Sequence, residues 1–310
     1  MEDKIQKIVA IVGPTAIGKT SLAIRLAQKI QAEIISGDSM QIYQEVAVGT
    51  AKATKEEQAQ VPHYLVDQHS VFDDYSVKNF VDEAQAAVKQ ITAKGRFPLL
   101  VGGTGFYVNA LLNDLKLGDR ADEERAIAPE WQDFLAKQGP EALWRELNNK
   151  DPAAAAKIPP ANSRRTLRAL TVISRTGCLF SKQQKEIKPR YDYLIIGLNG
   201  NRSKIYERIN QRVDLMMDQG LLDEARFIYQ NRDKEHQVLQ AIGYKEFFPY
   251  FAGEASLADC VSSLKQASRR YAKRQLTYFR NKLPVEWFDP LDDPDCFEKI
   301  VTRVEDWMKD

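Results

Sequence analysis

The sequence feature that most constrains this chain is a phosphate-binding loop close to its start. Residues 13–20 read GPTAIGKT and match the pattern G-x-x-x-x-G-K-[ST] at both glycines, the lysine and the threonine. Residues 8–12 are apolar and mostly β-branched, like a buried parallel strand, and residues 20–31 have the spacing and composition of a helix. The pattern binds phosphate in this strand–loop–helix context. A parallel sheet is therefore expected; a chance glycine-rich turn is the alternative.

The chemistry of such a loop assigns roles to its residues. Its glycines let successive backbone N–H groups point at phosphate oxygens, and the following helix N-terminus adds a partial positive charge. Lys19 is expected to reach the terminal phosphates, and the Thr20 hydroxyl to hold Mg²⁺. The residues expected to bind the diphosphate portion of a ligand are Gly13, Thr15, Ala16, Ile17, Gly18, Lys19 and Thr20.

Composition limits the class of protein. A hydrophobic content of 44% and a charged content of 28% are typical of a soluble globular protein. The net charge is +1, so any attraction to nucleic acid must come from a local basic patch. Three scattered cysteines without a C-x-x-C pair indicate neither a zinc site nor disulfides. We expect a cytoplasmic protein with no secretory leader and no membrane partner, since no apolar run approaches spanning length.

The order of expected elements predicts an α/β fold. Apolar runs predict strands at residues 7–12, 33–36, 63–66, 98–101 and 193–198, with helices at 20–31, 77–94 and mainly after 202. Alternating strands and helices after a phosphate loop predict a doubly wound, mostly parallel sheet. Residues 119–187 lack strand patterns and predict a helical insertion domain, which leaves 1–118 and 188–310 as the catalytic core domain.

Two more segments end at the carboxyl edge of this sheet, where ligands bind in such folds. Asp38, after an apolar run, is placed to hold Mg²⁺ through water or to accept a proton from a nucleophile; the alternative is a cap for the next helix. Thr104, within VGGTG, is placed to contact a phosphate oxygen or to cap a helix. We expect residues 13–20, 37–41 and 102–105 to line one cavity. The missing aspartate at 101–105 argues against a motor-type or switch-type ATPase.

Basic residues gather in two segments, 162–168 and 269–282. Helical geometry puts Arg270, Arg274, Thr277 and Asn281 on one side of the second segment. Both clusters are candidates for contact with nucleic acid, although a basic helix is often only a solvated face.

Single residues suggest further contacts. Arg208 and Arg212, one turn apart, are placed to reach an anion or to form surface ion pairs. Gln41 could pair with an adenine edge and Tyr43 could stack on a base, although either could equally be an ordinary loop residue. The rings of Tyr271 and Tyr278 could stack on bases or pack in the core.

Five ordered segments together resemble a known family. They are GPTAIGKT at 13–20, SGDSMQIY at 36–43, VGGTGFY at 101–107, QAIGYK at 240–245 and KRQLTYFR at 273–280. In this combination the chain resembles the bacterial tRNA dimethylallyltransferases over almost its whole length. Its scattered cysteines predict no zinc finger of the kind often found at the C-terminus of eukaryotic relatives.

The resemblance implies an activity and assigns roles. Members transfer a dimethylallyl group from dimethylallyl diphosphate to N6 of adenine-37 in the tRNA anticodon loop. The phosphate loop and Arg212 would then hold the diphosphate with Mg²⁺ at Thr20, Asp38 would be the general base, and Thr104 would contact the bridging or leaving oxygen. The insertion would grip the anticodon stem, and the protein is expected to act as a monomer.

The resemblance also implies which residues contact tRNA. They are Asp38, Ser39, Met40, Gln41, Asn162, Arg164, Arg165, Thr166, Gln240, Gly243, Tyr244, Lys245, Lys273, Arg274, Gln275, Thr277 and Arg280. The alternatives are an isopentenyltransferase for free adenine nucleotides, a small-molecule kinase and a non-catalytic nucleotide-dependent RNA-binding module. The insertion and both basic clusters favour tRNA.

Overall fold

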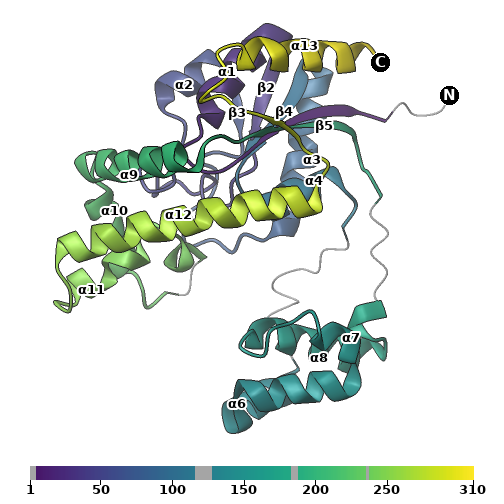
Figure 1. Cartoon of the computed structure of the whole chain (residues 1–310), viewed down its shortest axis with the longest axis vertical. Coiled ribbons are helices and arrows are strands. Elements are labelled where there is room, and N and C mark those ends of the chain that lie inside the picture. The colour runs from purple at the N-terminus through teal and green to yellow at the C-terminus, as the bar shows by residue number, and fades with distance from the viewer. Residues whose placement is uncertain (1–4, 116–127, 183–187, 235–236) are drawn as a thin grey trace. The chain divides into compact units, whose positions relative to one another are not determined.

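The chain forms two compact units. The first contains Met1–Asp114 and Pro189–Asp310, and the second contains Leu115–Lys188. The structure, a computed structural model shown in Figure 1, describes residues 5–115, 128–182, 188–234 and 237–310. Each unit is described by itself.

A six-stranded, all-parallel sheet organises the first unit, with the strand order β3-β2-β4-β1-β5-β6 (Figure 1). The strands are β1 (Lys7–Val12), β2 (Ala32–Ser36), β3 (His63–Tyr64), β4 (Phe97–Gly102), β5 (Asp192–Leu198) and β6 (Glu286–Phe288). The five expected strands are present, although β3 ends two residues earlier than predicted. The edge strand β6 was missed, because a three-residue strand is too short to show a periodic pattern.

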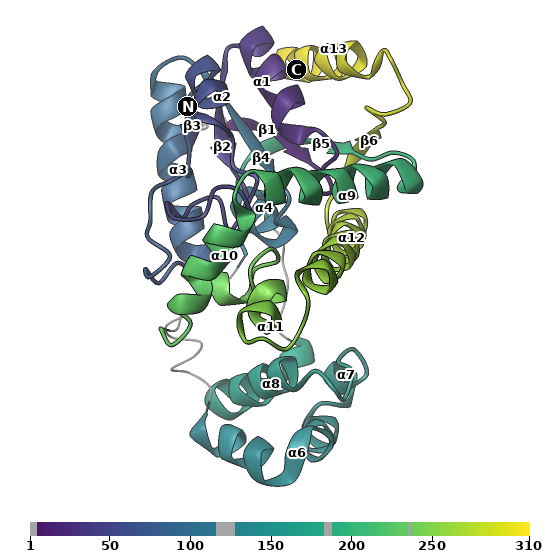
Figure 2. The same ribbon diagram turned by 90° about the vertical axis from the view of Figure 1, so that its left-hand side faces the viewer.

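Helices cover both faces of this sheet, as the doubly wound prediction requires. Val9 and Ile11 of β1 belong to the core that contains α1 (Lys19–Ile30) and α13 (Cys296–Lys309). Side chains alternate between the faces of a strand, so Ile8 and Ala10 face the layer of α3 (Val77–Ala93) and α4 (Gly105–Leu112). Ile8 to Val12 are all fully buried, which explains the continuous apolar run of β1. Figures 1 and 2 both show α13 beside α1.

The remaining helices of the first unit follow β2 or β5. They are α2 (Lys55–Gln60), α9 (Arg202–Asp218), α10 (Leu221–Gln230), α11 (Phe248–Phe251) and α12 (Leu257–Lys282), with short 3₁₀ turns η2 (Gln237–Gln240) and η3 (Lys245–Phe247). The 26-residue helix α12 packs along α9, and Figure 2 shows the two helices close together. Among the described residues, no helix has both the length and the apolar composition needed to cross a bilayer.

The second unit is a small helical bundle. It contains α6 (Pro129–Lys150), α7 (Pro152–Ala155), α8 (Ser163–Thr176) and η1 (Phe180–Lys182). Leu143, Leu147 and Leu170 are fully buried in its own core. A kink divides α6 at Gly139, which has a φ of 79°. Pro140 follows directly, and a proline inside a helix removes one backbone hydrogen bond.

The first unit holds together the two chain segments that connect it to the second. An antiparallel bridge joins Asn113 to Pro189. Arg190 donates from Nη1 to the carbonyl oxygens of Ala110 and Leu111, at 2.9 and 2.8 Å. The chain therefore leaves the first unit and re-enters it at neighbouring points.

Candidate active site

Three loops meet at the carboxyl edge of the sheet. They follow β1, β2 and β4, which are neighbours in the sheet order. The Thr104 N–H donates to the Gly37 carbonyl oxygen at 3.3 Å, and the Ser39 N–H donates to Thr104 Oγ1 at 3.1 Å. The side chain of Gln275 bridges the phosphate loop to the third loop: Oε1 accepts from Thr15 N–H at 2.9 Å, and Nε2 donates to the Gly103 oxygen at 3.0 Å. The three segments therefore meet at one edge of the sheet, while the expectation that they line one cavity stays a prediction.

The first of these loops has the backbone expected of a phosphate-binding loop. Gly18 precedes α1 with φ 103°, a left-handed conformation that glycine adopts without steric cost. The Lys19 ammonium folds back over the loop and donates to the carbonyl oxygens of Gly13 at 3.1 Å and Pro14 at 2.8 Å. Ile17 is buried, so only its backbone can contact an anion.

Lys19 is electrostatically poised for an anion. Burial lowers its pKa to about 8, the like charge of Arg212 contributes to the lowering, and the carboxylate of Asp38 opposes both effects. An ammonium in this state lacks its full hydration and stands beside another cation. A phosphate group would supply the missing counter-charge.

Asp38 combines features of a general base. Burial raises the pKa of its carboxyl group, while the Met40 N–H, Lys19 and Arg212 act in the opposite direction. Its Oδ1 accepts the Met40 N–H at 3.0 Å, but the residues that follow, 39–42, form bends and turns and not a helix. Asp38 therefore stabilises a local turn and does not cap a helix. A carboxylate with a raised pKa accepts a proton more readily than an ordinary one.

Two arginines of α9 reach the same loop. Arg208 donates from Nε to the Ala16 carbonyl oxygen at 2.8 Å, and Arg212 Nη1 lies 3.5 Å from Thr15 Oγ1. Burial lowers the pKa of Arg212, and Asp38 opposes that shift. Both arginines therefore lie at the phosphate loop, and their contact with an anion stays a prediction.

Tyr271 joins the site, although the sequence offered it only as a stacking or core residue. Burial raises its pKa most, and the nearby carboxylate of Asp38 raises it further. The side chains of Thr104 and Gln275 oppose that shift, which indicates that the Tyr271 hydroxyl lies near both of them. Tyr271, Gln275 and Tyr278 are spaced i, i+4, i+7, which puts them on one face of α12. That spacing was the available signal for an inward-facing stripe.

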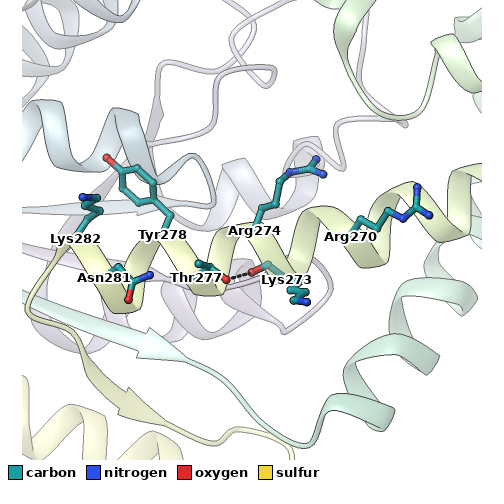
Figure 3. A pocket seen from close by; sticks show the side chains of 7 residues that line it. All are labelled: Arg270, Lys273, Arg274, Thr277, Tyr278, Asn281 and Lys282. Atoms are coloured by element: carbon teal, nitrogen blue, oxygen red, sulfur yellow. Dashed lines mark hydrogen bonds between the residues drawn. The ribbon is translucent and has the colours of Figure 1, made fainter. Parts of the chain in front are cut away.

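The exposed side of α12 next to this face is basic. A pocket of about 570 Å³ is lined there by Arg270, Lys273, Arg274, Thr277, Tyr278, Asn281 and Lys282 (Figure 3). Arg270, Arg274, Thr277 and Asn281 share this pocket, which agrees with the predicted shared side.

Two other basic residues of α12 have partners on neighbouring elements. Arg280 lies over the ring of Trp287, with 5.6 Å between guanidinium carbon and ring centroid, and Arg269 donates to Asn210 Oδ1 at 2.6 Å. Gln275 is only 5% exposed, so its side chain holds the loops together and does not face the pocket.

Several other expected tRNA contacts are engaged inside the protein. Gln41 accepts from Ser36 Oγ at 2.9 Å and donates to the carbonyl oxygens of Thr50 and Ala51, both at 3.3 Å. Tyr43 is fully buried, so the prediction that its ring could stack on a base is wrong for this structure. Met40 is half-buried.

The 240–245 segment divides into a buried and an exposed part. Tyr244 is fully buried. Gln240 and Lys245 are exposed, and the Lys245 ammonium donates to the Gln240 carbonyl oxygen at 2.9 Å. The Gly243 N–H donates to Glu246 Oε2 at 2.9 Å. The exposed pair is thus the part of this segment that can meet a macromolecule.

Basic residues of the second unit lie on α8. Asn162 caps this helix by accepting the Arg165 N–H at 3.2 Å. Arg164 and Arg165 are exposed, whereas Thr166 is fully buried and donates to the Asn162 carbonyl oxygen at 3.1 Å. The arginines, not the threonine, are accessible to a partner.

A carboxylate clamp around Glu224 was not recognised in the sequence. Oε1 accepts the N–H groups of Ala47 and Val48, both at 2.8 Å. Oε2 accepts the Gly49 N–H at 3.0 Å and the Tyr244 hydroxyl at 3.2 Å. The clamp ties the loop that follows Asp38 to α10 and to the 240–245 segment.

Replacing Glu224 with glutamine should destabilise the first unit. The amide nitrogen of glutamine cannot accept hydrogen bonds, so about half of the clamp is lost, and hydrogen bonds to charged groups contribute about 1.5–3 kcal/mol. We expect the free energy of unfolding in urea to fall by roughly that amount. Asp223→Asn makes the same chemical change at a neighbouring position on α10 and should stay within about 0.5 kcal/mol of wild type. Equal effects for the two variants would remove the special role of Glu224.

The site offers oxygen ligands for one hard cation. Among the described residues, no group of three or more His, Cys, Asp or Glu side chains could hold a metal ion. The Thr20 hydroxyl on the first turn of α1 and the Asp38 carboxylate are available at the loops. Mg²⁺ commonly takes one or two protein ligands and completes its shell with substrate phosphates and water. The residues therefore fit a magnesium ion that binds together with an anion.

Comparison with known proteins agrees with this geometry. Residues 41–282 match the family described as IPP transferase. A tRNA dimethylallyltransferase of Lactobacillus delbrueckii subsp. bulgaricus is 72% identical over 306 residues, which cover 99% of each chain. Its counterpart in Lactobacillus acidophilus is 70% identical and covers 98% of this chain and 99% of its own length.

Solved structures give the same result. A tRNA isopentenylpyrophosphate transferase of Bacillus halodurans aligns with a TM-score of 0.72 and 44% identity, covering 98% of this chain and 96% of that one. A eukaryotic dimethylallyltransferase described as acting on tRNA aligns with a TM-score of 0.84 and 29% identity, covering 98% of this chain and 80% of its own. With the family match spanning most of the sequence and its relatives aligned end to end, the chain belongs to the IPP transferase family.

Proposed function

We propose that this chain is an enzyme that transfers a dimethylallyl group from dimethylallyl diphosphate to N6 of adenine-37 in the tRNA anticodon loop and releases diphosphate. One observation carries the proposal. A carboxyl group with a raised pKa, Asp38, stands at the same loop cluster as the phosphate loop and its cations Lys19 and Arg212. A base beside an anion cradle is what a transfer with a diphosphate leaving group requires.

The transfer follows from this arrangement. An exocyclic adenine amine is a weak nucleophile, so the allylic carbon must become strongly electrophilic as its bond to the diphosphate oxygen breaks. Lys19, Arg212 and the N–H groups of the phosphate loop stabilise the charge that develops on the departing diphosphate. The N6–carbon bond forms, and Asp38 takes the proton that N6 loses. Each bond that breaks therefore has a group placed to accept its charge or its proton.

Thr104 and the metal site complete the machinery. The Thr104 hydroxyl, which accepts the Ser39 N–H and lies near Tyr271, would hydrogen-bond the bridging oxygen that leaves with the diphosphate. Thr20 would hold Mg²⁺, which when bound supplies further neutralisation of the diphosphate charge. Excluding water at this edge protects the allylic cation from hydrolysis.

The basic surfaces supply the tRNA interactions. The target adenine must leave the stack of the anticodon loop to reach Asp38. The basic side of α12 would contact the RNA backbone, and the exposed arginines of α8 would grip the anticodon stem. Since the phosphate loop and the basic side of α12 come from one chain, we propose that it acts as a monomer, in the cytoplasm.

A substrate competition tests the proposal. The protein would be incubated with labelled dimethylallyl diphosphate and equal concentrations of unmodified tRNA and AMP, and the label in each product counted. We expect label in tRNA and only background in AMP. Label in AMP but not in tRNA would support a transferase for free nucleotides, and ATP turnover with no transfer would support a kinase.

Arg274→Ala should weaken tRNA binding and flatten its salt dependence. Arg274 lines the exposed basic pocket of α12, and each lost phosphate contact reduces the slope of log K against log[salt] by roughly one. Affinities would be measured over a salt series. Arg25→Ala, an exposed arginine on α1 that packs over Phe297, is the matched control and should leave the slope unchanged. An unchanged slope for Arg274→Ala would indicate that the basic side of α12 is only a solvated surface that does not contact tRNA.

A further inference from the structure

Gln275 lies between two surfaces that the proposed function assigns to different substrates. It belongs to α12, whose outward side carries the basic pocket, and its own side chain is buried against the phosphate loop. Its sequence neighbour Arg274 is exposed and faces that pocket (Figure 3). One helical turn therefore presents a cation outward and an amide inward.

Both ends of the Gln275 amide are used, and each end holds a different loop. Oε1 accepts the N–H of Thr15 in the phosphate loop at 2.9 Å, and Nε2 donates to the carbonyl oxygen of Gly103 at 3.0 Å. The fit is tight, because a Cβ atom added at Gly103 would lie 2.3 Å from Gln275 Nε2. The loops are 260 and 172 residues away along the chain.

Neighbouring residues on the same face of α12 add to the link that Gln275 forms between the two loops. Tyr271, one turn earlier, lies near Thr104 and Asp38, which both influence the pKa of its hydroxyl. Tyr278, almost one turn later, accepts from Asn109 Nδ2 of α4 at 3.1 Å, and its ring closely contacts Gly105. A displacement of α12 by a bound macromolecule would therefore be transmitted to the loops, and Gln275 is the residue that connects to the phosphate loop itself.

We propose that Gln275 is a positioning residue that couples tRNA binding on α12 to diphosphate binding in the phosphate loop, an inference that rests on the proposed function. Because both ends of the Gln275 amide are bonded, it fixes the Thr15 N–H in place. The other N–H groups of the phosphate loop are then free to point toward the anion. When one ligand has ordered these loops, the second ligand causes a smaller loss of conformational entropy when it binds. Each ligand therefore binds more tightly when the other is present.

The test measures this coupling directly. The dissociation constant of inorganic diphosphate with Mg²⁺ would be measured by calorimetry, with and without a saturating anticodon stem-loop RNA. In the wild-type protein we expect the RNA to lower it by roughly tenfold, within the usual range of such couplings. In Gln275→Met, which has a similar size but no hydrogen-bonding amide, the factor should fall below about twofold. The RNA affinity without diphosphate should change little.

Two further variants separate coupling from folding. Gly103→Ala places a methyl group against Gln275 from the opposite side and should also abolish the coupling, while α12 keeps its own sequence. Arg274→Ala should weaken RNA binding but retain the full factor once the RNA is saturating. If Gln275→Met proves to be unfolded by circular dichroism, Gly103→Ala decides the question.

The outcomes are distinct from those of the transfer assay. A wild-type factor of one, or a full factor in both Gln275→Met and Gly103→Ala, would overturn the coupling role even if prenyl transfer to tRNA is observed. If coupling depends on Gln275 but no prenyl transfer is observed, the coupling role of Gln275 would be supported and the proposed activity refuted.

Discussion

Replacing Asp38 with asparagine is expected to lower the single-turnover rate of prenyl transfer by about 10²–10⁴-fold, the usual contribution of a general base. Asparagine has nearly the same size and can still accept the Met40 N–H at its amide oxygen, so the loop should keep its shape. Affinities for tRNA and for inorganic diphosphate should stay close to wild type. Near-normal single-turnover chemistry in this variant would rule out Asp38 as the base.

The pH dependence of the same reaction gives an independent check on Asp38. A base acts only when it is ionised, so kcat/KM should rise with pH through the raised pKa of Asp38. kcat/KM should fall again at higher pH, as the Lys19 ammonium, with a pKa of about 8 in the free protein, loses its proton and with it the positive charge that binds the diphosphate. The profile of kcat/KM for dimethylallyl diphosphate is therefore expected to be bell-shaped. The residual activity of Asp38→Asn should lack the acidic limb.

The second large effect is expected for Lys19→Met. This change removes the one ammonium group that donates into the phosphate loop at Gly13 and Pro14, among the residues the structure describes. Removing a single group that stabilises developing negative charge typically costs about 10²–10³-fold in rate, and kcat/KM should fall by at least that factor. Lys29→Met, at an exposed position in the last turn of the same helix, is the matched control. Wild-type kcat/KM in Lys19→Met would contradict the anion-cradle role of this residue.

A second substitution at the same position separates charge from titration. Lys19→Arg introduces a guanidinium group, which keeps its positive charge throughout this pH range. The alkaline limb of the kcat/KM profile should therefore move to higher pH in this variant. A limb that stays at its wild-type position would assign the alkaline loss of activity to a group other than Lys19.

Much of the fold was predictable because its signals are local. The fully buried strand β1 reads as a continuous apolar run, and glycines occur where the chain turns into α1. β6 was missed, since its three residues gain their strand conformation only by pairing with β5. Such pairing depends on a contact between distant segments, which no local pattern contains.

The candidate site was predictable to the same extent. The sequence placed three loops at one edge because the carboxyl ends of parallel strands lie together. It also identified the basic side of α12 from helical periodicity. It did not show what the other side of α12 contacts, because Gln275 meets loops more than a hundred residues away. Glu224 was missed, and Tyr244 was placed among the tRNA contacts, because their bonding partners are brought together only by folding.

The most direct test of the account concerns what happens to the diphosphate held by the phosphate loop. Excess protein would be mixed with dimethylallyl diphosphate and unmodified tRNA, and the released diphosphate quantified beside the prenylated nucleoside after digestion of the tRNA. We predict equal molar amounts of diphosphate and N6-dimethylallyladenosine, with neither formed when tRNA is absent and no turnover of added ATP. ATP-dependent release of ADP without a prenylated nucleoside would contradict the account.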